Sequence, residues 1–320
     1  MALGHSNAAL AAVLKEQLAL RLQMRDLGRL EYFTGLELRY VPGGIHLSQR
    51  KYAGEVLGTY RMSTAQPAPT PIDPGQKPTP RMPGEPECSV GADVYRSSVG
   101  SLQYLVATRP DIAYAVGVAA RYVSAPAERH WQLVSRILRY VQGTQTYGLF
   151  FSASSEMTLH AFTDADWAGD LGDRRSTSGY ICMMGNCVIS YASKKQNVVA
   201  LSTCEAEYIA GSLAAQEVLF LRQLLSGLGR PQIGATTLHM DNQSAISFAT
   251  NPMMTQKAKH IDIRHHFIRD HTEKGTIAPL YCKSGDNLAD IFTKALAKPT
   301  FFKLRATMGV IPPEASGTLV

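Results

Sequence analysis

The spacing of apolar positions changes near residue 155, and different elements are predicted on either side of it. Before this point, alanine and leucine positions predict a helix over 8–23, and two apolar runs around Pro42-Gly43-Gly44 predict a hairpin over 30–52. Three helices are predicted between Asp93 and Tyr147. The clearest has apolar residues on one face and arginines off it, which favours a packing unit over a dedicated nucleic-acid surface.

Beyond residue 155, the pattern predicts strands that first follow one another and then alternate with helices. The strands are predicted over 157–164, 177–185, 187–194, 236–241 and 276–283, and the helices over 202–228, 243–250, 260–274 and 287–298. Three consecutive antiparallel strands followed by this alternation predict an α/β fold, with a mixed five-stranded sheet and helices on both faces.

Proline is concentrated between the two predicted halves. Eight of the seventeen prolines lie between Pro67 and Pro86, a density that a packed helix or a central strand does not tolerate. The segment 67–92 is therefore predicted to be a linker or an extended wrap over the surface.

Composition narrows the function only slightly. With 320 residues, 45% of them apolar, the chain is long enough to form two or three globular domains. Its net charge of +6 is compatible with a polyanionic partner, although many proteins are equally basic. Five cysteines without a Cys-x-x-Cys pair argue against a disulfide framework and a zinc ribbon. The apolar stretch from Ala8 to Leu14 is too short to span a membrane, and no secretion signal is expected.

Two aspartates stand at the ends of predicted strands. Asp164 ends the strand 157–164, and Asp241 closes the strand 236–241 just before a helix. Each has an ordinary structural explanation, because Asp164 begins a turn rich in aspartate and Asp241 suits a helix N-cap. Strand ends are nevertheless where carboxylates converge to bind Mg²⁺ ions, which prefer oxygen ligands.

Two further acids lie in predicted helices. Glu205 has capping-box spacing from Ser202, whereas Glu207 heads the apolar face of the helix 202–228. A carboxylate on a buried face is costly unless it is paired or bound to a metal, and we favour a metal ligand over an ion pair. Asp290 lies in the first turn of the last predicted helix, where it also suits the helix dipole. Together, Asp164, Glu207, Asp241 and Asp290 predict a metal centre.

At these acids the chain resembles the ribonuclease H domain of copia-type retrotransposon Pol polyproteins. The matching strings are TDADWAGD (163–170), RRSTSGY (174–180), SKKQNVVALSTCEAEY (193–208), MDNQSAI (240–246), KHIDIRHHFIRD (259–270) and NLADIFTKAL (287–296). Upstream, MRDLGRLEYFTGLEL (24–38), GGIHLSQRKY (43–52) and YRSSVGSLQYLVATRPDIAYAV (95–116) resemble the stretch that follows the polymerase centre in these polyproteins.

The resemblance implies a domain order. Residues 1–66 would be an α+β remnant of the reverse transcriptase palm region, and 67–92 the proline-rich linker. A helical thumb or connection segment would occupy 93–150, the ribonuclease H domain 155–300, and a tail 301–320. The chain has no Asp-Asp pair, which the polymerase motif of this family contains, so reverse transcriptase activity is expected to be absent.

The resemblance also implies an activity. The family's metal ligands fall on Asp164, Glu207, Asp241 and Asp290, where two Mg²⁺ or Mn²⁺ ions would support cleavage of the RNA strand of an RNA–DNA hybrid. The partners implied are this hybrid and other Pol products, in the cytoplasm or the nucleus. The alternative is a non-catalytic nucleic-acid-binding protein or a decayed transposon remnant.

Four basic residues are candidates for contacts with the hybrid. They are Arg174, Arg175, Lys194 and Lys195. Phosphate neutralisation dominates the affinity of proteins for nucleic acids. A solvated basic loop explains these residues equally well.

Overall fold

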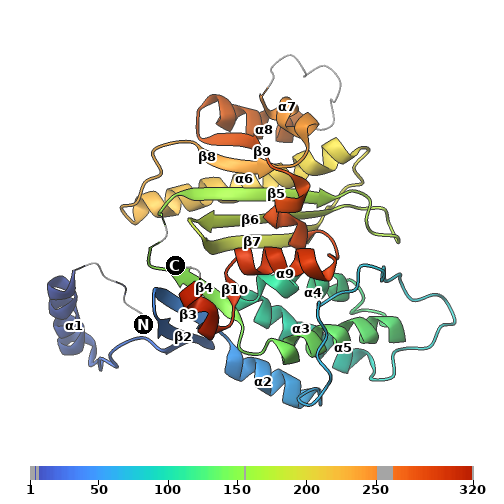
Figure 1. Ribbon diagram of the computed structural model, residues 1–320, viewed down its shortest axis with the longest axis horizontal. Helices are drawn as coiled ribbons and strands as arrows, with labels where there is room; N and C mark the ends of the chain where they lie inside the picture. Colours follow the sequence, from blue (N-terminus) through green and yellow to red (C-terminus); the bar gives the residue numbers. More distant parts are fainter. Residues whose placement is uncertain (1–3, 5–6, 155, 251–261, 319–320) are drawn as a thin grey trace.

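Two five-stranded sheets organise the residues that the computed structural model describes, which are 4, 7–154, 156–250 and 262–318 (Figure 1). The first sheet is antiparallel, with the order β1-β2-β3-β4-β10. Its strands are β1 (Tyr32–Phe33), β2 (Leu36–Val41), β3 (Gly44–Ser48), β4 (Gly148–Ser152) and β10 (Val310–Ile311). The predicted hairpin is confirmed, because β2 and β3 pair from Val41 and Gly44 outward.

The second sheet is mixed and has the order β7-β6-β5-β8-β9. Its strands are β5 (Leu159–Asp166), β6 (Thr177–Met184), β7 (Cys187–Lys195), β8 (Thr236–Met240) and β9 (Ile277–Tyr281). The first three are antiparallel neighbours, whereas β8 lies parallel to both β5 and β9. The predicted mixed five-stranded sheet is therefore confirmed.

Three helices cover one face of this second sheet: α6 (Thr203–Gly227), α7 (Gln243–Thr250) and α8 (Asp262–Glu273). The N-terminus of α6 forms half of the predicted capping box, because Glu205 binds the amide before the N-cap residue Ser202 and not the N-cap amide itself. The Ser202 hydroxyl accepts a hydrogen bond from the Glu205 amide, and the Glu205 carboxylate accepts one from the Leu201 amide. Small side chains at Ala206 and Ala210 let α6 pack closely on Ala165 of β5.

The opposite face of this sheet is covered by the 3-10 helix η5 (Leu288–Phe292), which packs on β5 and β6, and by α4 (Ala113–Ala120), which packs on β7. Two further helices from the first half of the chain, α3 (Ala92–Leu105) and α5 (Glu128–Gly143), pack against α4. Ile181, Met183 and Val188 of the sheet belong to the same buried core as these helices. Helices on both faces are thus confirmed, and a single core crosses the boundary near residue 155.

The C-terminal segment departs from the prediction. The closing helix expected over 287–298 is wrong, because this stretch forms η5 and α9 begins later, at Lys298–Thr307. Pro299 lies in the first turn of α9, where proline is favoured because its missing N–H would have no partner in the helix. The tail expected at 301–320 is also wrong, since Phe301 and Leu304 are buried and β10 pairs with β4.

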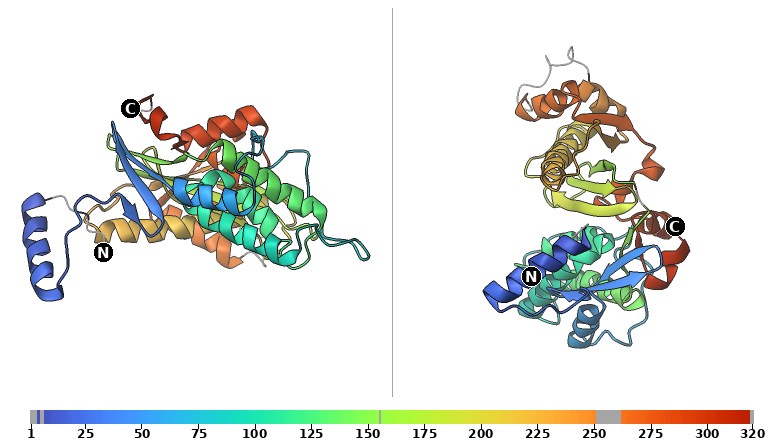
Figure 2. Two further views of the ribbon diagram at one scale, coloured as in Figure 1. Left: turned by 90° about the horizontal axis from the view of Figure 1, so that it is seen from below. Right: turned by 90° about the vertical axis from the view of Figure 1, so that its left-hand side faces the viewer.

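Two helices precede the proline-rich segment. Helix α2 (Arg50–Thr59), which the sequence analysis did not predict, packs on α5, whereas α1 (Ala8–Leu22) confirms its prediction and stands apart from both sheets (Figures 1 and 2). Leu10 and Leu20 of α1 are 68% and 72% exposed, so this helix has an uncovered apolar side. No described helix is both long and apolar enough to cross a membrane.

The proline-rich segment wraps along α5. The Ala68 amide donates to the Arg139 carbonyl, and the guanidinium of Arg136 donates to the Thr70 carbonyl. Farther along, Arg129 donates to the carbonyls of Thr79 and Pro80. These contacts to the α5 backbone and arginines fit the surface-wrap interpretation of 67–92 better than a free linker.

The shared core predicts that the two halves unfold together. Phe301 is buried in it and packs edge-on against Tyr140 of α5, with ring centroids 5.6 Å apart. We expect Phe301→Ala to lower the free energy of unfolding by about 3 kcal/mol, because it leaves a cavity in this core. Urea unfolding would be followed separately at Trp131 of α5 and at Trp167, in variants that each retain one tryptophan.

The control is Phe220→Ala, because Phe220 is 59% exposed and its loss should change stability little. Coincident transitions at both tryptophans, shifted equally by Phe301→Ala, are the expected result. A shift at Trp131 alone would show that the halves are independent.

Candidate active site

Three of the four predicted acids meet at one end of the second sheet. Asp164 lies near the end of β5, Asp241 directly follows the parallel strand β8, and Glu207 is in the second turn of α6. One carboxylate oxygen from each residue lies within 4.8 Å of the others. Adjacent parallel strands thus bring Asp164 and Asp241 together, as their strand-end positions predict.

Glu207 is the most constrained of these acids. Its side chain is buried, and its Oε2 atom has no hydrogen-bond partner. Burial, with Asp164 and Asp241 nearby, raises the pKa of this carboxyl to about 9. A buried carboxylate oxygen without a donor, facing two further carboxylates, fits a divalent cation and not a structural ion pair.

Asp290 reaches the same site from η5, on the other side of the sheet from α6. It lies outside the group of three, but burial and the nearby Asp164 raise its pKa to about 7. Gly179 of β6 makes room for η5, because a Cβ there would meet the Thr293 Cγ2 atom at 2.7 Å and the Phe292 Cβ atom at 2.8 Å. The Asn287 amide anchors the start of η5 by donating to the Thr163 carbonyl at 3.0 Å.

Several neighbouring side chains hold the acids, and the sequence analysis did not single them out. The Thr293 hydroxyl donates to Asp164 Oδ2, and the Ser284 hydroxyl donates to Asp241 Oδ2 at 2.7 Å. The Lys294 ammonium lies 2.9 Å from Asp290 Oδ1 and 3.5 Å from Asp164 Oδ2. Asn287, Thr293 and Lys294 all fall inside the matching string 287–296, which was the available indication of their importance.

The four predicted nucleic-acid contacts differ in availability. Arg174 and Lys194 are exposed. Lys195 is engaged within the protein, with its ammonium 2.6 Å from Asp170 Oδ2 and 2.9 Å from Asp173 Oδ2. Arg175 lies 3.6 Å from the Asp173 carboxylate. The exposed pair is therefore better placed for phosphate contacts than Arg175 and Lys195.

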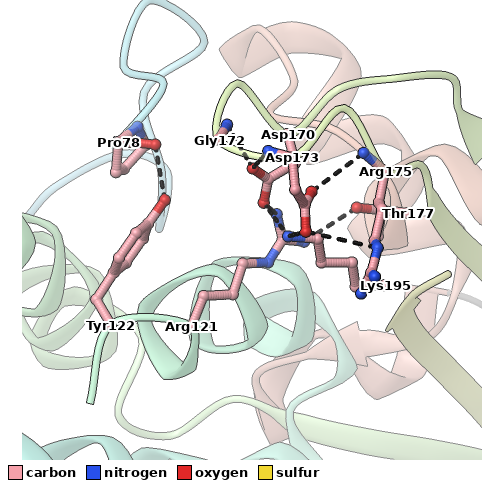
Figure 3. Close-up of polar contacts among 9 residues, drawn as sticks. All are labelled: Pro78, Arg121, Tyr122, Asp170, Gly172, Asp173, Arg175, Thr177 and Lys195. Atoms are coloured by element: carbon pink, nitrogen blue, oxygen red, sulfur yellow. Dashed lines mark hydrogen bonds and ion pairs between the residues drawn. The ribbon is translucent and has the colours of Figure 1, made fainter. Parts of the chain in front are cut away.

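Asp170 connects this loop to the first half of the chain (Figure 3). Its carboxylate accepts a hydrogen bond from Arg121, the C-cap residue of α4, at 3.0 Å, and Arg121 also donates to the Thr177 hydroxyl. Burial opposes ionisation of Asp170, but Lys195 and the Gly172 amide outweigh it and lower its pKa. The ion-pair network therefore fixes the β5–β6 loop beside the acids.

The whole sequence was compared with family models and with curated proteins. No family model matches the chain. It is 38% identical over 310 residues to the retrovirus-related Pol polyprotein from transposon RE2 of Arabidopsis thaliana, covering 95% of this chain and 21% of that protein. It is 37% identical over 307 residues to the corresponding polyprotein from transposon TNT 1-94 of Nicotiana tabacum, covering 94% and 23%.

The chain belongs to the family of retrovirus-related Pol polyproteins from copia-type transposons. It spans about a fifth of the length of the two Pol polyproteins above. Another relative, the uncharacterized mitochondrial protein AtMg00810 of Arabidopsis thaliana, is 38% identical over 221 residues, which are 67% of this chain and 88% of that protein.

Comparison with solved structures found partial matches to this Pol segment. The ribonuclease H1 of the halophilic archaeon Halobacterium salinarum is 15% identical, and the match covers 42% of this chain and 94% of that one, with a TM-score of 0.30. The foamy viral protease-reverse transcriptase, solved with an RNA/DNA hybrid, is 12% identical over 88% of this chain and 34% of that one, with a TM-score of 0.44.

The crowded acids of this Pol segment predict a pH-dependent stability without metal. Because folding raises the pKa of Glu207 from 4.5 to about 9, the folded chain binds more protons than the unfolded chain in that interval. In EDTA, the free energy of unfolding should fall as the pH rises through it. Glu207→Gln should reduce this fall by up to about 1.4 kcal/mol per pH unit.

Mg²⁺ should raise the melting temperature of the wild type, and Glu207→Gln should lose most of that increase. The matched control is Glu205→Gln in the first turn of the same helix, because glutamine can still accept the capping hydrogen bond. Equal pH profiles and equal Mg²⁺ responses for all three proteins would contradict this account of Glu207.

Proposed function

We propose that the chain is a divalent-metal-dependent endonuclease that cleaves the RNA strand of RNA–DNA hybrids, as a segment of a copia-type Pol polyprotein. Its ribonuclease H-like fold and its Pol relatives support a nuclease of the ribonuclease H type. The observation that carries the proposal is the convergence of Asp164, Glu207 and Asp241 on one point, with a buried Glu207 oxygen that lacks a donor.

The four acids would hold two Mg²⁺ or Mn²⁺ ions. Asp164, Glu207 and Asp241 would supply one group of ligands, and Asp290 would extend it on the η5 side. Bound ions of this kind activate water and stabilise the charge of the attacking and leaving oxygens during phosphodiester hydrolysis, which here would give a 3′-hydroxyl and a 5′-phosphate.

The chain's own side chains would prepare the site for this chemistry. Thr293 and Ser284 orient the carboxylates of Asp164 and Asp241, and Asn287 fixes the start of the segment that carries Asp290. Such fixed ligands avoid the cost of reorganising the site during the reaction. Asp241 is the least buried of the four acids, so the substrate would approach from its side.

The proposed partner is the hybrid, with other Pol products as further partners in the cytoplasm or the nucleus. Arg174 and Lys194 would neutralise phosphates next to the acids, and Arg175 and Lys195 would join them only by leaving Asp173 and Asp170. Residues 155–300 would form the nuclease segment, and 1–66 and 93–150 would correspond to the palm remnant and the connection of the polyprotein. Reverse transcriptase activity would be absent.

Cleavage of a labelled hybrid tests the proposal. The purified chain should cut only the RNA strand in Mg²⁺, and Asp241→Asn should reduce the rate at least about a hundredfold, because a metal centre contributes several kcal/mol to the rate. The matched control is Asp270→Asn, which removes an exposed carboxylate that pairs only with Lys274 among the described ion pairs. A folded chain that binds hybrids but never cuts them, in Mg²⁺ or Mn²⁺, would instead support the non-catalytic alternative.

The exposed basic pair gives a second test, measured as hybrid binding in EDTA. Replacing Arg174 and Lys194 together with glutamine should weaken binding and reduce the slope of log affinity against log salt by about 2, or about 1 for each phosphate that is no longer neutralised. The control is Lys51→Gln, an exposed lysine of α2 in the first half. An unchanged salt slope would remove these two residues from the proposed interface.

A further inference from the structure

Lys294 places a positive charge inside the acid cluster of Asp164, Glu207, Asp241 and Asp290. Its ammonium lies 2.9 Å from Asp290 Oδ1 and 3.5 Å from Asp164 Oδ2, so it joins an acid of η5 to an acid of β5. Both acids are almost fully buried, whereas the Lys294 side chain is 37% exposed. The ammonium therefore reaches the cluster from its solvent side.

A cation held by both Asp164 and Asp290 would compete with this ammonium for the same oxygens. A divalent ion shared by Asp164 and Asp290 would occupy the space between their carboxylates, which is where the Lys294 charge lies. Two cations that share the same oxygens at these distances repel each other strongly in a partly buried site. Binding of the ion would thus require the ammonium to withdraw.

Asp166 offers the withdrawing ammonium another partner. It follows Asp164 by two residues on β5, so both side chains start from the same face of the sheet. A short movement of a flexible lysine side chain would keep its charge paired.

We propose that Lys294 is a positioning residue that acts as an internal counter-cation: it holds Asp164 and Asp290 together in the metal-free protein and competes with the metal ion that these acids bind. The inference rests on the proposed function only in taking the four acids as metal ligands. Lys294 thereby makes the affinity for metal lower than the acids alone would give. It also reduces the electrostatic cost of folding without metal.

Calorimetric titration of the full chain with Mn²⁺, without nucleic acid, tests this competition. Lys294→Met should bind Mn²⁺ about five- to tenfold more tightly than the wild type, because one opposing charge is removed. Lys294→Arg keeps the charge and should stay close to the wild type. The matched control is Lys274→Met, since Lys274 forms an ion pair of the same i,i+4 spacing with Asp270, away from the cluster.

The melting temperature in EDTA gives a second readout. Lys294→Met should melt below the wild type, and saturating Mn²⁺ should reverse that order. If Lys294→Met does not fold, the comparison is between Asp290→Asn alone and Asp290→Asn combined with Lys294→Met. The double variant removes the negative charge of Asp290 as well as the positive charge of Lys294, so no unpaired acid is left between them. The double variant should then bind Mn²⁺ more tightly than Asp290→Asn alone.

Equal or weaker Mn²⁺ binding after loss of Lys294 would overturn the inference, as would the absence of Mn²⁺ binding in every variant. If Lys294→Met binds Mn²⁺ more tightly but the wild type does not cut hybrids, the inference stands and the proposed nuclease is refuted. If the wild type cuts hybrids but Lys294→Met has unchanged Mn²⁺ affinity, the proposed nuclease stands and the inference is refuted.

Discussion

Mutual repulsion among buried carboxylates is the constraint on which the rest of this structure depends. Asp164, Glu207 and Asp241 bring oxygens within 4.8 Å of one another, and the burial of Asp164 and Glu207 removes water that would screen their charges. Each acid comes from a different element, so the elements must be held in place by forces outside the site. The packing of α6 on β5 and of η5 on β6 provides these forces through small residues, Ala206 and Ala210 on α6 and Gly179 on β6.

The helices that pack on the two faces of the second sheet explain why the site depends on residues from both halves of the chain. One face is closed by α6, α7 and α8, but the other is closed by η5 and by helices from the first half of the chain. The segment after η5 returns to the first sheet through α9 and β10, and it carries Phe301 and Leu304 into the shared core. Asp290 is therefore positioned by contacts on both sides of the boundary near residue 155.

The sequence predicted the sheet and the acids for reasons that the structure makes clear. Alternating apolar positions located β5, β6 and β7, and an acid on the apolar face of a helix marked Glu207, which is buried as expected. Asp290 was assigned to the first turn of a helix over 287–298, but it lies in a 3-10 helix that ends before Pro299. Spacing cannot show which residues of such a turn meet a distant strand, and Thr293 and Lys294 were missed for that reason.

The sequence also could not show which of the four basic residues are free to contact a ligand. Charge alone made Arg174, Arg175, Lys194 and Lys195 equivalent, whereas the fold gives two of them acidic partners within the chain. Asp173 pairs with Arg175, and Asp170 gathers Lys195 and Arg121 from two halves that the sequence presents as separate. A lysine that closes such a network stabilises the loop next to the acids, and it can contact a phosphate only if the network opens. The positive charges of Arg175 and Lys195 therefore serve the architecture of the site, and the proposed phosphate contacts are reduced to the exposed pair, Arg174 and Lys194.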